Sequence, residues 1–300
     1  MKLSIIICTH NRVAILKLCL NAIRDLSFSR GSLEVLVIDN NSTDSTRSLV
    51  EECYLLDDRI KYYKEEKVGL IAARNRGAAA ASGKWLIYLD DDALLDENSF
   101  REITQTIDTH PFLLFTGIWK EWHLQTPPKW LPYNTGNYIL RGTDEIRAIG
   151  DDYITGLIMI VRRDKLLEIG GFPPHLVGMS GDKIAYGDES WVEHEFRKRG
   201  WSVGINPNIV IEHLVGEHKY KLSWHLEAAF AKGRDTQIIH RSFSKISAMR
   251  GLVKNLLLGW LKPMAKFILR SKYYWQNFVI DYIGGIRYYK GVLEYFKNKN

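Results

Sequence analysis

The sequence predicts an α/β fold in which helices flank a mostly parallel sheet, followed by a helical extension at the C-terminus. Residues 1–120 alternate short β-branched runs with segments of helical period, which is the pattern of successive strand–helix units. Residues 241–300 carry apolar residues at helical spacing and a strong basic excess. With 300 residues and 46% hydrophobic content, the chain is long and apolar enough for a sizeable folded core.

The first half of the chain is expected to build most of the sheet. Residues 2–10, "KLSIIICTH", predict a first strand that is buried on both faces, because its apolar residues are continuous. Apolar residues at helical spacing predict a helix over residues 13–26. The next elements are a strand, a polar turn and a helix over 33–53 with Ser42, Thr43 or Asp44 as N-cap, a shorter strand over 60–66, a small-residue helix over 68–83, and a fourth strand over 84–92.

The second half is less regular. Residues 119–150 contain three tryptophans and two adjacent prolines, and we expect a long irregular loop there. A strand and a short helix are predicted over 153–172, and an acidic turn that opens a helix over 187–201. One or two strands over 202–218 then deliver His213.

The cysteines and the apolar runs bear on the compartment. Cys8, Cys19 and Cys53 are few, odd in number and set in apolar contexts, which favours buried packing in a reducing compartment over a disulfide framework. The apolar run at the N-terminus ends without a cleavage-site pattern, so we expect no signal peptide. No window holds about 18 uncharged apolar residues, so no spanning helix is expected. These patterns predict a cytoplasmic catalytic part.

Three consecutive carboxylates, Asp90, Asp91 and Asp92, directly follow the fourth predicted strand. Adjacent carboxylates repel, and a carboxylate in a low dielectric is costly without a compensating positive charge. A hard divalent cation, Mn²⁺ or Mg²⁺, would resolve this conflict and could neutralise a diphosphate. Thr9 and Asp39 end two other strands, at the edge where open α/β sheets bind ligands. Gly-rich phosphate loops and zinc-ligand spacings are absent from the sequence, so a nucleotide pocket built from acidic strand ends is predicted.

Five stretches carry a resemblance to a known family: "SIIICTHNR", "EVLVIDNNSTDST", "VGLIAARNRGAAAASGKWLIYLDDDALLD", "GLIMIVRRDKLLEIGGF" and "GDESWVEHEFRKRGW". In this order and spacing they resemble the inverting family 2 glycosyltransferases of the GT-A fold, over residues 1–235. The resemblance implies a Rossmann-like catalytic domain, a nucleotide-sugar donor, a metal-binding Asp-x-Asp-type motif and a carboxylate base. Within that domain, residues 1–118 would bind the nucleotide sugar and residues 119–235 would face the acceptor.

The same resemblance assigns candidate roles to single residues. Asp92 matches the metal ligand, Asp91 would reach ribose or the waters of the metal, and Asp90 occupies a variable position. His213 resembles a C-terminal histidine that approaches the metal or the diphosphate. The positions expected to bind the nucleotide sugar are Thr9, Asn11, Arg12, Asp39, Arg74, Asn75, Asp90 and Asp91.

Asp188 and Glu189 hold the place of the family's acidic pair, but in reversed order. Counting back from Gly200, where the helix ends, puts Glu189 where the base normally lies, so we favour Glu189 and keep Asp188 as the alternative. The base would take the proton of an acceptor hydroxyl as its oxygen attacks the anomeric carbon, so that the configuration inverts. The expected donor is a UDP-sugar, from family frequency alone. The expected acceptor is a glycan or a lipid-linked glycan in cell-surface polysaccharide synthesis.

Residues 236–300 form the predicted helical tail. Its last sixty residues hold twelve Lys and Arg against two Asp and Glu, and a helix with apolar and basic faces, kinked at Pro263, is expected around Met249 to Ile268. The helices either pack on the catalytic domain or a second subunit, or attach to an anionic membrane surface, which we favour. The expected location is therefore peripheral, on the inner face of the membrane, and an oligomer stays possible. Nucleic acid is not expected, because the tail has no recognisable binding motif and the active-site face is acidic.

Each motif also has a structural interpretation. The Asp triplet would then be a solvated turn, Asp39 part of an Asx turn, and Asp188 and Glu189 a cap on their helix. The tryptophans of the loop, Trp119, Trp122 and Trp130, either fill a small core or stack on sugar rings. Two rival functions stay open: a sugar nucleotidyltransferase, whose Gly-rich, Arg-containing loop is missing, and an inactive nucleotide-sugar-binding scaffold at the membrane.

Overall fold

The computed structural model describes residues 2–27, 32–131, 145–150, 154–173 and 184–297. The chain forms two compact units. The sheet unit comprises Met1–Trp122, Tyr138–Gly181 and Asp188–Leu214, and the helical unit comprises His123–Asn137, Asp182–Gly187 and Val215–Asn300.

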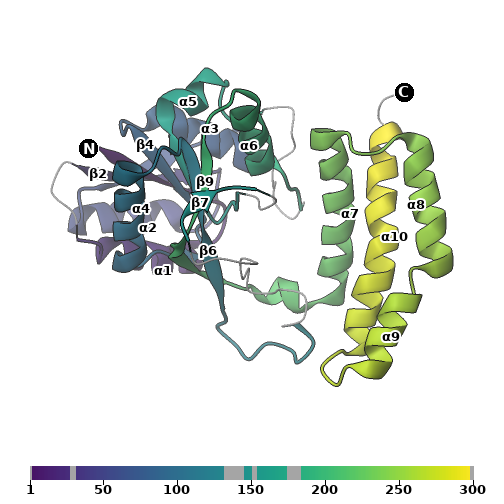
Figure 1. Cartoon of the computed structure of the whole chain (residues 1–300). Coiled ribbons are helices and arrows are strands. Elements are labelled where there is room, and N and C mark those ends of the chain that lie inside the picture. The colour runs from purple at the N-terminus through teal and green to yellow at the C-terminus, as the bar shows by residue number, and fades with distance from the viewer. Residues whose placement is uncertain (1, 28–31, 132–144, 151–153, 174–183, 298–300) are drawn as a thin grey trace. The chain divides into compact units, whose positions relative to one another are not determined.

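The sheet unit is built on one mixed sheet (Figure 1). Its strands among the described residues are β1 (Leu3–Thr9), β2 (Leu33–Asp39), β3 (Ile60–Lys64), β4 (Trp85–Leu89), β5 (Ala93–Leu94), β6 (Leu114–Trp122), β7 (Arg147–Ala148), β8 (Ile158–Arg162) and β9 (Val203–Leu214). They follow the order β3-β2-β1-β4-β8-β6-β9-β5, with β7 beside β9. The neighbours from β3 to β4 run parallel, whereas β8 is antiparallel to both β4 and β6. The predicted α/β class is confirmed, with a parallel half joined to a mixed half.

Helices cover both faces of this sheet. They are α1 (Val13–Arg24), α2 (Thr46–Leu56), α3 (Leu70–Ala80), α4 (Glu97–Thr109), α5 (Arg163–Glu168) and α6 (Asp188–Lys198). Leu3, Ile5 and Ile7 join the core that α1, α2 and α4 complete. Ile6 points the opposite way, toward α3, where a Cβ at Gly77 would overlap its side chain. Strand β1 is therefore buried on both faces, as its continuous apolar run predicts.

Two elements of the sheet unit differ from the expectation. Helix α4 and strand β6 fill residues for which we predicted no element, and β6 reaches Trp122, inside the expected loop of residues 119–150. Strand β6 pairs with β8 and β9, which come much later in the chain. Within the same expected loop, residues 132–144 lie outside the described part.

The helical unit contains α7 (Leu222–His240), α8 (Lys245–Leu258), α9 (Leu261–Leu269) and α10 (Trp275–Lys297), after a short 3₁₀ helix, Glu217–Tyr220. Helix α10 runs between α7 and α8 (Figure 1). A Cβ at Gly233 of α7 would overlap the carbonyl oxygen of Tyr288, so α7 and α10 pack backbone against backbone. The helix is interrupted between Leu258, the end of α8, and Leu261, the start of α9. This interruption comes just before Pro263, where we expect a kink.

The expected boundary after residue 235 falls within α7 and stays a prediction. None of the described helices is long and apolar enough to cross a membrane.

Candidate active site

Strands β1, β2 and β4 end at one edge of the sheet, and the predicted site residues meet there. The Thr9 hydroxyl donates a hydrogen bond of 2.7 Å to Asp91 Oδ2. The Arg12 guanidinium, which precedes α1, donates to Asp91 Oδ1 over 2.5 Å and to Asp92 Oδ2 over 2.8 Å. The side chains of Asp91 and Asp92 are only 5% and 10% exposed. Two buried carboxylates thus receive compensating charge from the chain itself.

Burial makes two carboxyls of the triplet harder to ionise. Burial raises the pKa of Asp90 to about 7, and the neighbouring carboxylates add to this while Arg74 opposes it. Burial likewise raises the pKa of Asp91 to about 6, against the lowering effect of Arg12. Raised carboxyl pKa values mean that Arg12 and Arg74 only partly offset the cost of burying the ionised forms.

Arg74, on α3, joins the triplet to the acidic pair of α6. Its side chain is 3% exposed, and Nη1 donates to Asp188 and, over 3.0 Å, to Glu189. Nη2 lies 3.6 Å from Asp90. The guanidinium also lies over the Phe172 ring, 5.4 Å from its centroid. One buried cation therefore holds carboxylates from two parts of the chain in a single cluster.

The two members of the acidic pair differ in access and in charge. Both lie in the first turn of α6, but Asp188 is buried, whereas the Glu189 side chain is 18% exposed. Burial raises the pKa of Glu189 to about 8, repulsion by Asp188 adds to the shift, and Arg74 opposes it. A carboxylate with a pKa near neutrality, partly open to solvent, is suited to accept a proton from a hydroxyl.

Asp92 and His213 form the candidate metal pair. They come together because β5, which follows the triplet, pairs with the end of β9, and Leu214 N donates to Asp92 O over 2.9 Å. His213 Nε2 lies 3.6 Å from Asp92 Oδ1. Two ligands about 2.1 Å from one ion are about 3 to 4 Å apart, so a single ion could contact both.

No group of three or more His, Cys, Asp and Glu side chains in the described part of the chain is arranged to hold a metal ion. Mg²⁺ and similar hard cations often take only one or two carboxylates and complete their shell with water and substrate phosphates. The carboxylate and imidazole at Asp92 and His213 fit such an ion in chemistry.

The end of β2 forms the neighbouring part of the edge. Asp39 accepts hydrogen bonds from Ser42 N over 2.8 Å and from the Tyr62 hydroxyl over 2.7 Å. Asn11, whose φ is 53°, accepts from Thr43 N over 2.7 Å. These bonds tie the loop after β1 to the loop after β2 and fix the orientation of the Asp39 carboxylate.

Asn75 holds Phe172, the residue whose ring lies under the Arg74 guanidinium. Its side chain donates to Phe172 O and accepts from Phe172 N, each over 2.8 Å. Three residues that the sequence analysis did not predict contact the site: Phe172, under Arg74, Tyr62, through Asp39, and Gly156, where a Cβ would overlap the Glu189 carboxylate. Strand alternation from the buried Ile60 could have indicated Tyr62, whereas nothing local distinguishes Gly156.

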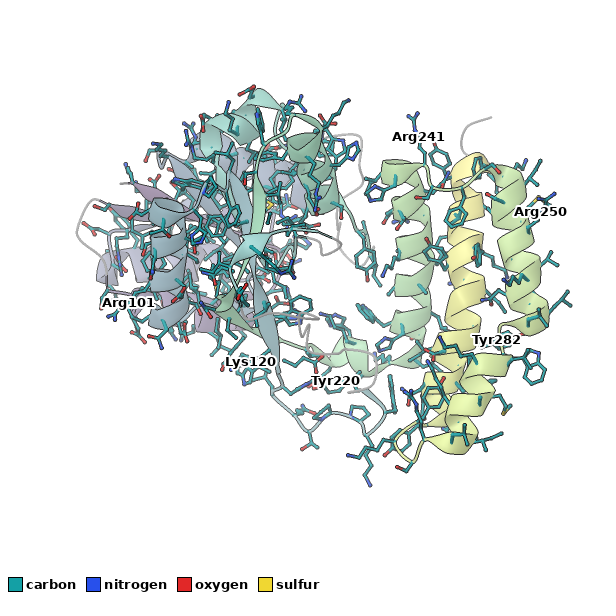
Figure 2. The ribbon with its side chains drawn as sticks, in the orientation of Figure 1. Arg101, Lys120, Tyr220, Arg241, Arg250 and Tyr282 are labelled. Atoms are coloured by element: carbon teal, nitrogen blue, oxygen red, sulfur yellow. The ribbon has the colours of Figure 1, made fainter. Side chains whose placement is uncertain are left out.

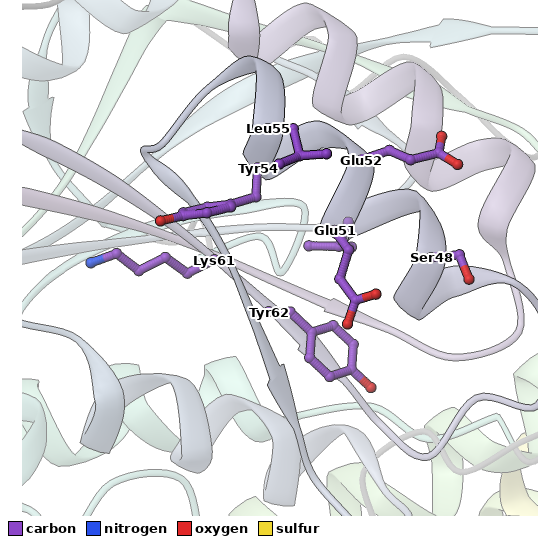
Figure 3. Close-up of a pocket in the computed structure, with 8 residues that line it drawn as sticks. Ser48, Glu51, Glu52, Tyr54, Leu55, Lys61 and Tyr62 are labelled. Carbon is purple, nitrogen blue, oxygen red and sulfur yellow. The ribbon is translucent and has the colours of Figure 1, made fainter.

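A pocket of about 580 Å³ lies between α2 and β3 (Figure 3). Tyr54 and Leu55 line it and are 50% and 83% exposed. Tyr62 also lines it, so the pocket adjoins the back of the Asp39 contact. None of the predicted site residues lines it.

Comparison with curated proteins finds glycosyltransferases. Over 93 residues the chain is 40% identical to a GalNAc(5)-diNAcBac-PP-undecaprenol beta-1,3-glucosyltransferase from Campylobacter jejuni, an alignment that covers 30% of this chain and 29% of that enzyme. Over 281 residues it is 24% identical to the glucosyl-dolichyl phosphate glucuronosyltransferase of Haloferax volcanii, covering 90% of this chain and 88% of that protein.

Among solved structures, a mannosyltransferase from Pyrobaculum calidifontis in complex with GDP-Man and Mn²⁺ matches with a TM-score of 0.67 and 17% identity, over 100% of this chain and 88% of the other. S. aureus TarS 1–349 in complex with UDP matches with a TM-score of 0.55 and 16% identity, over 100% and 92%. These similarities identify the fold as GT-A. The model of the family "Glycosyl transferase family 2" matches residues 4–170, more than half of the chain. The chain belongs to glycosyl transferase family 2.

Proposed function

We propose that the protein is a metal-dependent, inverting glycosyltransferase that moves a hexosyl or hexosaminyl group from a nucleoside diphosphate sugar to an acceptor hydroxyl. The observation that carries the proposal is the single cluster around Arg74, in which the Asp triplet and the Asp188–Glu189 pair lie together. One set would hold the leaving diphosphate and the other would take a proton, which are the two tasks of such a transfer.

Glu189 is the proposed base. Its side chain is more exposed than that of Asp188 and its pKa is raised to about 8, so it would be reached by an acceptor hydroxyl and would accept the proton. The acceptor oxygen would attack the anomeric carbon opposite the leaving group, and the configuration would invert. Asp188, held by Arg74, stays the alternative base.

Asp92 and His213 are the proposed protein ligands of Mn²⁺ or Mg²⁺, with Asp91 in support. When bound, such an ion supplies Lewis-acid stabilisation of the departing diphosphate. Around it, Thr9 fixes the Asp91 carboxylate and Arg12 offers a planar, cationic fork that suits phosphate oxygens.

Asp39 is proposed to accept a hydrogen bond from the nucleoside, oriented by Tyr62 and Ser42. Residues 1–118 would bind the nucleotide sugar and residues 119–235 would face the acceptor. The matched structures hold UDP in one case and GDP-Man in another, so UDP-sugars are the first donors to test and GDP-sugars the second.

The acceptor is proposed to be a glycan or a lipid-linked glycan in cell-surface polysaccharide synthesis. The names of two relatives, one acting on a PP-undecaprenol-linked substrate and one on glucosyl-dolichyl phosphate, support a lipid-linked acceptor. Such an acceptor would place the reaction at a membrane surface.

The outer face of α8 and α9 supports attachment to that surface. On α8, Ala248 and Gly251 lie on the packed side, and a Cβ at Gly251 would overlap the Tyr289 ring of α10. Arg250 projects away from α10 (Figure 2). Large apolar side chains that are 40–81% exposed run along the other side: Ile246, Met249, Val253, Leu257, Trp260, Leu261, Ile268 and Leu269. Apolar residues beside Lys and Arg suit an anionic bilayer, and we propose the inner face of the membrane.

The test is product analysis with UDP-, GDP- and dTDP-sugars, Mn²⁺ and lipid-linked glycan acceptors. Proton NMR of the product should show an anomeric configuration opposite to that of the donor. Glu189→Gln and Asp92→Asn should each remove transfer. Retained configuration, or activity that survives both substitutions, would refute the proposed mechanism.

A further inference from the structure

We propose that Arg12 is a displaceable internal counter-cation: in the donor-free protein its guanidinium compensates Asp91 and Asp92, and it must leave Asp92 when a divalent metal binds. This inference rests on the proposed metal dependence and adds a regulatory contact to the same site. Its consequence is that the donor-free enzyme binds metal weakly and acquires metal and donor together.

The Arg12 guanidinium bonds the carboxylates of Asp91 and Asp92 at the same time. Nη1 bonds Asp91 Oδ1 over 2.5 Å, and Nη2 bonds Asp92 Oδ2 over 2.8 Å. The other oxygen of Asp92, Oδ1, is the atom that lies 3.6 Å from His213 Nε2. A divalent ion between Asp92 and His213 would therefore share one carboxylate with the guanidinium, and two cations on one carboxylate repel each other.

Of the two guanidiniums in the site, Arg12 is the one that can move. Arg74 is 3% exposed and is held by Asp188, Glu189 and the Phe172 ring. The Arg12 side chain is 31% exposed, so it can turn into solvent without crossing a packed core.

The backbone around Arg12 is fixed, so the side chain moves alone. Arg12 O accepts from Leu16 N over 2.9 Å, and Val13 N donates to Asp44 Oδ2 over 3.0 Å. A guanidinium released from Asp92 would therefore stay at the rim of the site, within reach of a diphosphate. Its planar donors match phosphate oxygens as well as they match carboxylates.

Arg12 would then act in opposite directions on the two ligands. Without donor it competes with the metal, and with donor it binds phosphate and leaves Asp92 to the metal. Because binding free energies are reciprocally linked, the donor should raise metal affinity as much as the metal raises donor affinity.

The experiment measures Mn²⁺ binding, not activity. Titrations followed by the EPR signal of free Mn²⁺ and by calorimetry compare the wild-type protein with Arg12→Gln, with and without UDP or GDP. Arg24→Gln is the matched control, because it removes one positive charge from the exposed end of the same helix, far from the triplet. Circular dichroism and the melting temperature verify that each variant is folded.

Without nucleotide, Arg12→Gln should bind Mn²⁺ about tenfold more tightly than wild type, and the enhancement of Mn²⁺ binding by nucleotide should shrink by about the same factor. Arg24→Gln should behave as wild type. Arg12→Lys keeps the charge but loses the planar fork that places one nitrogen on each carboxylate, so it should fall in between, and it serves if Arg12→Gln does not fold.

If the wild type clearly binds Mn²⁺ and folded Arg12→Gln binds it equally or more weakly, the proposed counter-cation role of Arg12 is wrong. The proposed metal dependence is then unaffected. If neither protein binds Mn²⁺ even with UDP or GDP, the proposed metal dependence fails, and the role of Arg12 fails with it.

Discussion

The guanidinium of Arg74 on α3 donates a 3.0 Å hydrogen bond to the carboxylate of Glu189 on α6. The same guanidinium binds Asp188 and lies near Asp90, so it contacts both halves of the candidate chemistry. Burial raises the pKa of Glu189, and the positive charge of Arg74 lowers it. Arg74 therefore tunes how readily the proposed base is ionised.

Glu189→Gln should lower the turnover number by about 10² to 10⁴-fold, the usual contribution of a general base. The KM for the donor should change little, because Glu189 is proposed to act on the acceptor. Steady-state kinetics with saturating acceptor would measure this. Glu195→Gln, on the same helix but paired with Arg199, is the control and should retain activity. A large fall for Asp188→Asn with a small fall for Glu189→Gln would identify Asp188 as the base.

The pH profile should report the raised pKa of Glu189. A base is active when it is deprotonated, so kcat/KM should rise with pH up to about 8 and then level off. Arg74→Gln removes the charge that lowers this pKa, and its profile should move to higher pH. A profile that is already flat from pH 5 upward would contradict an elevated pKa at the base.

The free energy of unfolding should also depend on pH through the raised pKa of Glu189. The folded-state pKa of Glu189 is raised above its ordinary value of 4.5. The folded state then holds its proton more tightly, so stability falls as pH rises from about 4.5 to about 8. Urea unfolding should measure the free energy of unfolding across this pH window. It should fall less for Glu189→Gln than for wild type, because only the wild type has a Glu189 carboxyl that ionises as the pH rises. Parallel curves for the two proteins would argue against the shift.

The dependence of activity on metal should distinguish the proposed role of Asp92 from that of His213. EDTA should abolish transfer and added Mn²⁺ should restore it. Asp92→Asn weakens the carboxylate ligand and should lose activity at every Mn²⁺ concentration tested, whereas His213→Ala should recover part of its activity at high Mn²⁺. Full activity of both variants in EDTA would exclude the proposed metal site.

Membrane attachment can be tested by sedimentation with lipid vesicles. The protein should pellet with vesicles rich in anionic lipid, less so at high salt, and weakly with neutral vesicles. Leu257→Ser with Ile268→Ser should reduce pelleting, because both side chains are exposed on α8 and α9. Leu55→Ser changes a residue that is 83% exposed on α2 and should have no effect. Equal pelleting by all three proteins would point away from α8 and α9.

The sequence alone identified the strand ends that meet at the site. Continuous apolar runs predicted β1, β2 and β4, and the residues at their ends, Thr9, Asp39 and the Asp triplet, lie at one edge as parallel pairing requires. Helix α6 begins at the predicted acidic pair. These features could be predicted because each depends on residues that are close together in the sequence.

The contacts that assemble the site depend on long-range pairing, and the sequence could not predict them. Arg74 and Asp188 are 114 residues apart, and no spacing links them. Asp92 meets His213 only because β5 pairs with β9. Arg12 was predicted to contact the nucleotide, and its bridge to Asp91 and Asp92 follows from the loop geometry after β1.

The most direct test of the central claim is the release of nucleoside diphosphate from UDP- and GDP-sugars in the presence of a lipid-linked glycan. The wild-type protein with Mn²⁺ should release diphosphate and extend the glycan, and EDTA, Asp92→Asn or Glu189→Gln should each stop both. Release and extension that continue unchanged in EDTA and in both variants would contradict the claim that this acidic edge performs the transfer.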